Sequence, residues 1–504
     1  MGFKTDTSFL RFLTMGALGT QHVMGQLSRL GFAPIELERY ASSNKIWTTK
    51  IKRLRLPDLL CVRTGMRIEV RAKSNLEIRM SHARNNPERH WDYGNLDADI
   101  VALVPCRNGD TGPVVAGDAT FFTFGALRQT VDQNQLSGLK AASEGSEQHL
   151  TWPAVVSSRP GLVLDVTRSS LGVEWSGDGM PSRRHTYTLN GKVPYVRPGE
   201  RFSGETQFLA GTPSSMADLD PYLEQQYDPL SELMSENRIS RYSAAKALAF
   251  RTDQQSRARS ILEQQIGVDP DTRVALEIAS TATGLGVTAA ADFIRKIIYT
   301  QAESPMCMEA IFVITELGRR GDTGFATAEL DSIAGDRWHF QANEARQAAV
   351  WGLGQAGVRA YKKLIPYLSD PEENVALHAI AAFGSDTPDG VIAELISVIL
   401  EGDLVKAASA SAALQNIGSA GVIKRLHVAA SAPHPRRPWL IATLGRLPEP
   451  DVRKVLQGYF ILRELEPLLL SSSADNWLAR EETIAGLAFL RKQCLWDPKA
   501  NEVG

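Results

Sequence analysis

Apolar and polar residues alternate in a recurring pattern along the second half of the chain. Six segments share a polar or basic start, an alanine-rich apolar stretch and a final residue that is usually glycine: Ser240–Phe250, Asp271–Gly284, Met306–Gly318, Ala345–Gly354, Asn374–Gly384 and Val405–Gly418. Their last residues lie 34, 34, 36, 30 and 34 positions apart. Apolar residues at i, i+3, i+4 and i+7 predict amphipathic helices. The period predicts two helices and two turns per unit.

A second helix is expected in several of these units, at Ala360–Leu368, Gly390–Leu400 and Gly421–Ala430. Asp370-Pro371 and Thr387-Pro388 predict turns between units, because proline cannot continue a helix. One unit cannot bury its apolar face alone, so the units are expected to stack. The recurrence resembles HEAT-like repeats, and this resemblance implies an α-solenoid over residues 235–504. Its surface is expected to bind a protein partner, nucleic acid or the N-terminal half.

The first hundred residues have a different pattern, which predicts an α/β domain over residues 1–110. We expect a helix at Ser8–Leu30, capped by Gly31, and a fully apolar central strand at Ile100–Val104. The elements expected between them are strands at Phe32–Tyr40, Ile46–Ile51, Leu59–Val62 and Met66–Lys73, a turn at Thr64-Gly65, and a polar helix or loop at Met80–Asp92. The first helix begins in an apolar stretch that is too short, and too charged, for a signal peptide.

A β-rich middle region is predicted for residues 111–215, followed by a linker over 216–234. Short alternating runs predict strands at Gly161–Val166, Gly172–Trp175, His185–Leu189 and Gln207–Ala210. Asn190-Gly191 predicts a hairpin turn between the segments on either side, since both residue types tolerate a positive φ.

Composition adds one local feature to this picture. The 504 residues carry a net charge of −2, which by itself indicates neither nucleic acid nor membrane as a partner. Residues 41 to 90, however, include twelve basic and only four acidic residues. Such a basic island is typical of a surface that binds a polyanion or of a solvated face. Four widely spaced cysteines and the absence of a long apolar run predict a cytoplasmic protein without a membrane span.

Candidate chemistry lies within this basic island. Asp58 precedes one predicted strand and Glu69 lies within the next, and the turn between these strands brings the two carboxylates together. Glu69, Arg71 and Lys73 alternate along a strand and so share one face. Two carboxylates on rigid strands suit Mg²⁺ or Mn²⁺, which can activate water and stabilise charge on a phosphodiester. Alternatively, Glu69 and Arg71 are an exposed pair and Asp58 is an ordinary turn residue.

These residues also carry a resemblance to a known family. Pro57-Asp58, ten residues, and then Glu69-Val70-Arg71-Ala72-Lys73 resemble the PD-(D/E)XK nuclease superfamily over about residues 8–106. The resemblance implies a restriction-endonuclease-like α/β core, Asp58 and Glu69 as metal ligands, and DNA endonuclease activity. The family's lysine falls on Arg71, so that Arg71 or Lys73 would supply the cation, and Gln21 lies where some members carry a helical glutamate.

The partner implied is DNA or RNA, in antiphage defence or DNA processing by analogy of fold. The phosphate backbone is expected to contact the surrounding basic residues Lys50, Lys52, Arg53, Arg55, Arg79 and Arg84, with His82 and His90 as further candidates. An alternative hypothesis is a catalytically inactive adaptor that retains the nuclease-like fold to bind DNA or protein. A third is a protein-binding solenoid with an unrelated cap. The sequence contains no P-loop string, so we do not expect this chain to hydrolyse nucleotides.

Overall fold

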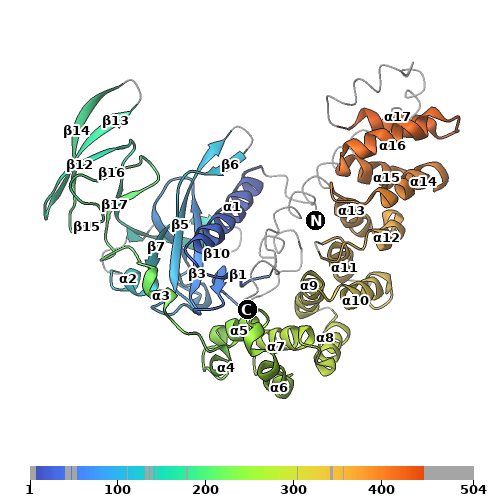
Figure 1. Cartoon of the computed structure of the whole chain (residues 1–504), viewed down its shortest axis with the longest axis horizontal. Coiled ribbons are helices and arrows are strands. Elements are labelled where there is room, and N and C mark those ends of the chain that lie inside the picture. Colours follow the sequence, from blue (N-terminus) through green and yellow to red (C-terminus); the bar gives the residue numbers. More distant parts are fainter. Residues whose placement is uncertain are drawn as a thin grey trace.

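The chain folds into an N-terminal α/β region with mixed sheets and a C-terminal all-helical region (Figure 1). The computed structural model describes residues 7–39, 47, 54–109, 112–130, 135–136, 140–142, 145–177, 180–302, 305–340, 344–355 and 357–447. The strand predicted at Ile46–Ile51 lies outside these ranges except for Trp47. None of the helices in the described ranges has the length and apolar character needed to cross a membrane.

The first sheet is mixed and has the strand order β1-β2-β3-β5-β6, with β7 also paired to β5. Neighbouring strands are antiparallel except β3 and β5, which are parallel. The elements are α1 (Thr7–Arg29), β1 (Pro34–Glu36), β2 (Leu59–Cys61), β3 (Arg67–Lys73), β5 (Ile100–Gly109), β6 (Gly112–Val115) and β7 (Thr120–Thr123). Helix α1 packs on one face of this sheet. The first helix and the strands predicted around residues 59–73 and 100–104 are therefore confirmed.

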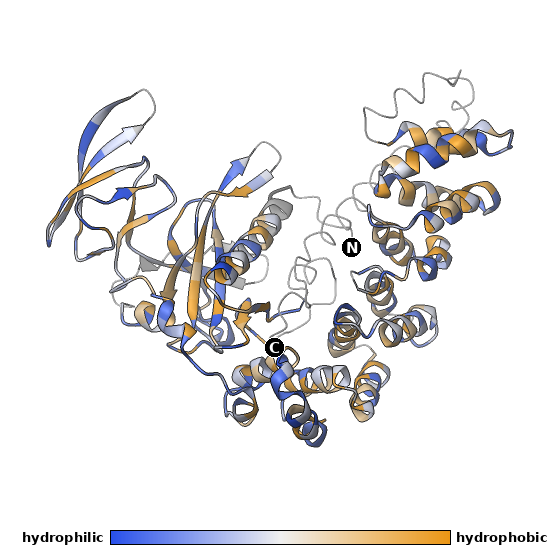
Figure 2. Ribbon diagram, in the orientation of Figure 1, coloured by the Kyte–Doolittle hydropathy of each residue, from blue (hydrophilic) through white to orange (hydrophobic). Residues whose placement is uncertain are grey.

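Strand β5 is buried on both faces, as its continuous apolar sequence predicts. Ile100, Ala102 and Val104 join the core beneath α1, whereas Val101 and Leu103 join a second core on the opposite face. Figure 2 shows the resulting band of hydrophobic residues through the middle of the sheet.

The segment Met80–Asp92, predicted as a polar helix or loop, is mostly loop with a short 3-10 helix, but its first three residues belong to a strand that was not predicted. Strand β4 (Ile78–His82) pairs antiparallel with β10 (Gly145–Trp152), and the 3-10 helix spans Pro87–Arg89. Strand β4 was missed because it depends on a partner more than sixty residues away, which local polarity cannot reveal. The strand predicted at Phe32–Tyr40 is shorter than expected.

The middle region is built from short strands in three further sheets, ordered β4-β10-β8 with β9 on β10, β11-β17-β15, and β14-β13-β12-β16. Their bounds are β8 Gln135–Leu136, β9 Lys140–Ala142, β11 Ala154–Val156, β12 Gly161–Val166, β13 Ser170–Gly177, β14 Met180–Thr188, β15 Val193–Pro194, β16 Arg201–Phe202 and β17 Phe208–Gly211; the short helix α2 is Phe124–Arg128. The four strands predicted here are confirmed.

The predicted hairpin at Asn190-Gly191 is half right. Both residues have positive φ, 47° and 80°, and the Lys192 N–H donates to the Leu189 carbonyl at 2.9 Å, so the turn forms. The strands on either side do not pair with each other, because β14 pairs with β13 while β15 pairs with β17. The turn therefore transfers the chain from one sheet to another.

The C-terminal region contains the helices predicted from the repeated pattern. Helices α5, α7, α9, α11, α13 and α15 correspond to the six alanine-rich segments, and each contacts the next of this set. In Figure 1 the helices follow one another in an arc that begins beneath the sheets. The bounds are α3 Asp220–Leu223, α4 Pro229–Glu232, α5 Arg238–Leu248, α6 Gln255–Gln265, α7 Thr272–Gly284, α8 Thr288–Thr300, α9 Pro305–Arg319, α10 Thr323–Gly335, α11 Ala345–Leu353, α12 Tyr361–Leu364, α13 Glu373–Ala382, α14 Asp389–Glu401, α15 Leu404–Ile417, α16 Ala420–Ser431 and α17 Arg437–Gly445, with 3-10 helices at Thr252–Gln254 and Ile365–Ser369.

Arg39, just after β1, joins the two regions through a buried cluster of charges. Its guanidinium pairs with Glu277 of α7 and with Glu309 and Glu316 of α9, and Glu309 Oε1 lies 3.0 Å from Arg39 Nη1. Lys246 of α5 also pairs with Glu316 at 2.7 Å. These five residues, called the Arg39 cluster below, bind the α/β region to the start of the helical region.

Trp47 forms a second buried contact between the regions. Its ring stacks on His378 of α13 with centroids 4.9 Å apart, and it also meets Phe312 of α9 at 5.9 Å and Trp351 of α11 at 6.2 Å. The indole is 1% exposed. The helical region thus contacts part of the N-terminal half, which is one of the three binding partners that the sequence analysis expects for its surface.

Candidate functional site

Asp58 is fixed where β1 and β2 run beside each other. Its carbonyl accepts a hydrogen bond from the Leu37 N–H at 2.9 Å, and its Oδ2 accepts one from the Val70 N–H at 2.7 Å. The side chain therefore reaches from the start of β2 to the backbone of β3. This second bond places the Asp58 carboxylate next to Glu69.

Strand β3 places its charged residues on the face opposite α1, as the alternation predicts. Ile68 and Val70 join the core beneath α1, and Ala72 packs closely on Gly19, where an added Cβ would lie 2.8 Å from the Ala72 Cβ. Glu69 and Arg71 consequently lie on the other face and form an ion pair. Their side chains are 14% and 34% exposed, so neither is simply a solvated surface group.

The two carboxylates influence each other. Burial and the nearby Glu69 raise the pKa of Asp58 well above its usual value, while Arg71 and the Val70 N–H oppose that rise. A carboxyl with a raised pKa beside a second carboxylate is costly to ionise, and a cation between the two would relieve that cost.

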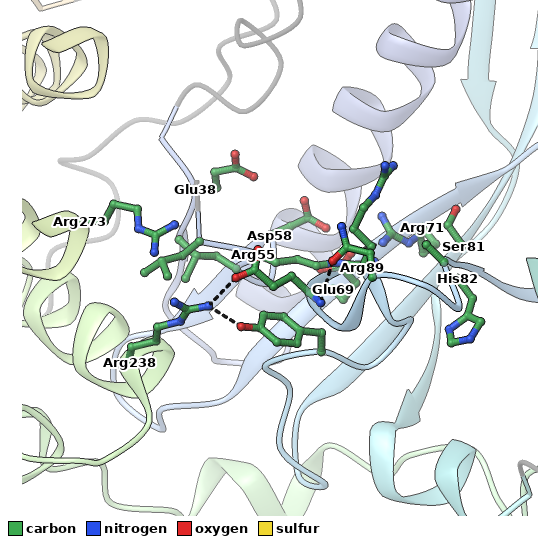
Figure 3. A pocket seen from close by; sticks show the side chains of 16 residues that line it. Glu38, Arg55, Asp58, Glu69, Arg71, Ser81, His82, Arg89, Arg238 and Arg273 are labelled. Atoms are coloured by element: carbon green, nitrogen blue, oxygen red, sulfur yellow. Dashed lines mark hydrogen bonds and ion pairs between the residues drawn. The ribbon is translucent and has the colours of Figure 1, made fainter. Parts of the chain in front are cut away.

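These residues line a cavity of about 530 Å³, within the range of small-molecule sites. Five arginines and four acidic residues contribute to its wall: Arg55, Arg71, Arg89, Arg238 and Arg273, with Glu38, Asp58, Glu69 and Glu88. Figure 3 shows Arg238 and Arg273 on one side, Arg71 and His82 on the other, and Asp58 between the two sides. The cavity therefore combines carboxylates with a wall suited to anions.

The donor set fits a divalent cation of the Mg²⁺ type with few protein ligands. Mg²⁺ is commonly bound through one or two carboxylates and keeps several waters. Asp58 and Glu69 provide two such carboxylates, whereas no group of three or more His, Cys, Asp or Glu side chains in the described ranges is arranged to hold a metal. A cation here would have two carboxylate ligands at most from these residues, and it would share Glu69 with Arg71.

Lys73 does not line the cavity, although it shares a face of β3 with Glu69. Its Nζ donates to the Arg79 carbonyl at 2.8 Å, which directs the ammonium group toward β4. Burial lowers the pKa of Lys73 to about 8. Of the two cations suggested by the sequence, Arg71 is the one in the cavity wall.

The expected nucleic-acid contacts divide into three groups. Lys50, Lys52 and Arg53 lie outside the described residues. Arg55 lines the cavity and donates to the His90 carbonyl at 2.7 Å. Arg79 pairs with Glu77 at 3.2 Å, and neither Arg79 nor the exposed Arg84 lines the cavity.

Other candidates from the sequence have mixed placements. His82 lines the cavity, and the His90 ring lies beside it in a tilted contact with ring centroids 4.9 Å apart. Burial and His90 lower the pKa of His82. Gln21 is exposed on α1 and is not part of the cavity wall.

Sequence reasoning missed five charged residues of the cavity wall: Glu38, Glu88, Arg89, Arg238 and Arg273. Glu38 lies just beyond β1, and only the pairing of β1 with β2 brings it near Asp58. Arg89 belongs to the basic island, but it was not among the residues expected to contact phosphate. Arg238 and Arg273 lie in the helical region, and no local pattern links them to β3.

Comparisons with known proteins assign no family. No family model matches the chain, and no curated protein matches it. Among solved structures, one engineered protein is 14% identical, covers 54% of this chain and 88% of its own, and has a TM-score of 0.23. Another is 17% identical, with coverages of 53% and 96% and a TM-score of 0.17. Such scores are too low to support a conclusion about fold or function.

Proposed function

We propose that this protein is a metal-dependent nuclease that hydrolyses phosphodiester bonds of DNA in the cavity at β2 and β3. One observation carries the proposal: Asp58 and Glu69 converge in a cavity whose wall also contains five arginines. Converging carboxylates suit a hard divalent cation, and arginines suit phosphate oxygens. An ordinary ion-pair network would not require a cavity beside it.

The arrangement of elements supports a PD-(D/E)XK-like core. Helix α1 precedes three antiparallel strands, and β5 then returns parallel to β3, in the order that the resemblance implies. One departure is the strand and 3-10 helix between β3 and β5, where the resemblance implies a helix. The helical region is in turn proposed to be a HEAT-like array, because each helix of the alternating set from α5 to α15 contacts the next helix of that set.

Each side chain in the cavity has a proposed task. Asp58 and Glu69 would hold Mg²⁺ or Mn²⁺, and the bound cation would supply an activated water and charge stabilisation. Arg71 would offset the negative charge that develops on the phosphate in the transition state. Arg55 would bind and orient the substrate phosphates. Lys73, held by the Arg79 carbonyl, would position β3 against β4 and not touch the substrate.

The test is cleavage of linear, plasmid and single-stranded DNA, and of RNA, in Mg²⁺ or Mn²⁺. We expect Asp58→Ala and Glu69→Ala to lose more than about 100-fold in rate, because loss of outer-shell partners alone costs 10- to 100-fold. Glu77→Ala is the matched control, since Glu77 pairs with Arg79 outside the cavity wall, and it should cleave like the parent. Equal activity in all three variants would exclude a carboxylate-bound metal at this site.

The ion pair between Arg71 and Glu69 favours a second candidate, the inactive adaptor. Under this hypothesis Arg71 permanently takes the place of the metal, and the cavity binds DNA without cutting it. The parent would then cleave no substrate with either metal, and DNA binding would persist in Asp58→Ala and Glu69→Ala. Arg71→Lys separates the two candidates further, because a nuclease should keep measurable activity with the family's usual residue.

A further inference from the structure

The sheet β14-β13-β12-β16 carries aromatic and basic side chains together on one of its faces. Residues directly opposite each other in an antiparallel pair share a face, and Trp175 of β13 lies opposite Arg183 of β14. His185 and Tyr187 follow Arg183 at alternate positions of β14, so they lie on this same face. Arg159, in the loop before β12, places its guanidinium over the Trp175 ring, 5.7 Å from the ring centroid. These five residues are called the β14 ledge below.

The three rings of the β14 ledge form a continuous aromatic surface. Trp175 and His185 stack with ring centroids 4.4 Å apart, and Tyr187 meets His185 at 4.5 Å and 75°. Such an edge contact leaves at least one face of the Tyr187 ring uncovered by His185. Trp175 and Tyr187 pack against the core of the module, yet all three residues are only half-buried. Bases of a single nucleic-acid strand stack on aromatic surfaces of this kind.

The two arginines of the β14 ledge have no carboxylate partner. Arg159 and Arg183 are exposed, and neither makes an ion pair with any residue that the structure describes. Glu174 is next to Trp175 along β13 and therefore lies on the other face, and Asp165 lies over that other face as well, opposite a glycine of β13. Exposed cations without a partner attract a further anion. Positive charge is thus concentrated on the face that carries the rings.

Ser157 holds one end of the β14 ledge in place. Its hydroxyl accepts a hydrogen bond from Trp175 Nε1 at 3.0 Å and donates one to the Arg159 carbonyl at 2.7 Å. Ser157 is fully buried, and the neighbouring turn carries Glu205, an exposed residue that makes no ion pair with Arg159. The Trp175 ring and the Arg159 backbone are therefore positioned before any ligand binds, which lowers the ordering cost of binding.

We propose that the β14 ledge binds a single strand of nucleic acid, whose phosphates contact Arg159 and Arg183 and whose bases stack on the rings. Guanidinium groups match phosphate oxygens in geometry, and bases present their faces to side chains only where they are unpaired. Strand β14 is also at the edge of its sheet, so one row of its backbone groups is open to further contacts.

This site is separate from the cavity at β3. No residue of the β14 ledge lines that cavity, and Figure 1 shows β12, β13 and β14 at the end of the α/β region that lies away from the helical region. Binding at the β14 ledge therefore requires neither the metal nor the cleavage of the proposed function. In a nuclease, the β14 ledge would hold a part of the strand that is not being cut.

The test is the anisotropy of a fluorescein-labelled oligothymidylate of about 15 nucleotides, titrated with the full chain in EDTA at several salt concentrations. Arg183→Ala should weaken binding about fivefold and reduce the slope of log K against log salt by about 0.7, because one phosphate contact is lost. Arg184→Ala is the matched control. It removes the same charge from the next residue of β14, on the face that carries Glu174, and should change affinity less than about twofold.

Tyr187→Leu tests the rings separately from the charges. It should weaken binding at least about fivefold and keep the parental salt slope, because a stacked base is lost but no phosphate contact. Thermal unfolding checks the fold of each variant, and His185→Gln replaces Tyr187→Leu if the latter is unfolded.

Equal effects of Arg183→Ala and Arg184→Ala would overturn this proposal, because they would show a general effect of charge. Parental affinity in Tyr187→Leu, or absence of oligonucleotide binding by the parent, would overturn it too. Binding that depends on Arg183 and Tyr187 without any cleavage would remove the nuclease proposal and retain this one. Cleavage by a protein whose binding does not depend on these residues would do the reverse.

Discussion

The Arg39 cluster and the cavity at β3 both place arginine among carboxylates. They differ in whether the arginine compensates the cost of ionising the carboxylate beside it. In the Arg39 cluster, burial would raise the pKa of Glu316, yet Arg39 and Lys246 hold it well below its usual range. In the cavity, Asp58 has a raised pKa despite the presence of Arg71. The first cluster is closed and fully paired, and the second opens into a space of about 530 Å³.

This difference separates a structural role from a functional one. A saturated buried cluster has little to gain from a ligand, and removing one member leaves the others uncompensated. A carboxylate that remains costly to ionise beside a cavity gains from an added cation. Perturbed groups are therefore informative about function chiefly where a cavity gives a ligand access to them.

The largest expected effect is on the closed cluster. Arg39→Ala should lower the free energy of unfolding by about 3–5 kcal/mol, because Glu277 and Glu309 lose their partner while still buried. Arg71→Ala is the matched variant in the cavity and should cost less than Arg39→Ala, since its side chain is 34% exposed and borders a cavity. Urea denaturation followed by circular dichroism measures both. Equal losses would remove the distinction between the clusters.

A smaller effect on stability is expected from the pH dependence of His378, which stacks on Trp47 at the other contact between the regions. Burial lowers the pKa of His378 to about 4 from its usual 6.5, with Glu344 opposing. The unfolded state takes up a proton first as the pH falls, so stability is present above pH 6.5 and is lost toward pH 4. At roughly pH 5 the loss is about 2 kcal/mol.

His378→Phe keeps a ring against Trp47 and removes the titrating group. Its stability should therefore change about 2 kcal/mol less than that of the parent between neutral pH and roughly pH 5. Urea denaturation at the two pH values measures the difference. The same pH dependence in parent and variant would show that His378 is not kept neutral by this contact.

The smallest expected effect is an increase in stability. Asp58→Asn should stabilise the protein by about 1 kcal/mol near neutral pH, because it removes a charge that is costly beside Glu69 and keeps an acceptor for the Val70 N–H. A raised pKa means that the unfolded state ionises first, so the parent loses stability as the pH rises above the usual carboxyl range. The variant should lack that loss. A destabilised Asp58→Asn would indicate that Asp58 serves the fold.

Local patterns predicted the parts of this molecule that depend on local physics. The alternation along β3 placed Glu69 and Arg71 on one face, and the apolar run at Ile100 predicted a strand buried on both faces. The alanine-rich segments predicted six helices correctly, because an amphipathic period is visible within each segment.

The parts that depend on contacts distant in sequence were not predictable. Strand β4 required its pairing with β10, and the Asn190-Gly191 turn gave no indication that its two strands belong to different sheets. The sequence likewise contained no signal that Arg238 and Arg273 would complete a cavity at β3. Such residues are brought together by the packing of whole regions, which no local period encodes.

Direct measurement of Mn²⁺ binding tests the central claim without relying on cleavage. The free Mn²⁺ signal in electron paramagnetic resonance is to be followed as the full chain is titrated, for the parent, Asp58→Ala, Glu69→Ala and the control Glu77→Ala. We predict a site in the parent and in Glu77→Ala that disappears in the other two variants, because both carboxylates are needed to hold the ion. No binding by the parent at millimolar Mn²⁺, or binding unchanged in Asp58→Ala and Glu69→Ala, would contradict a metal centre at these carboxylates.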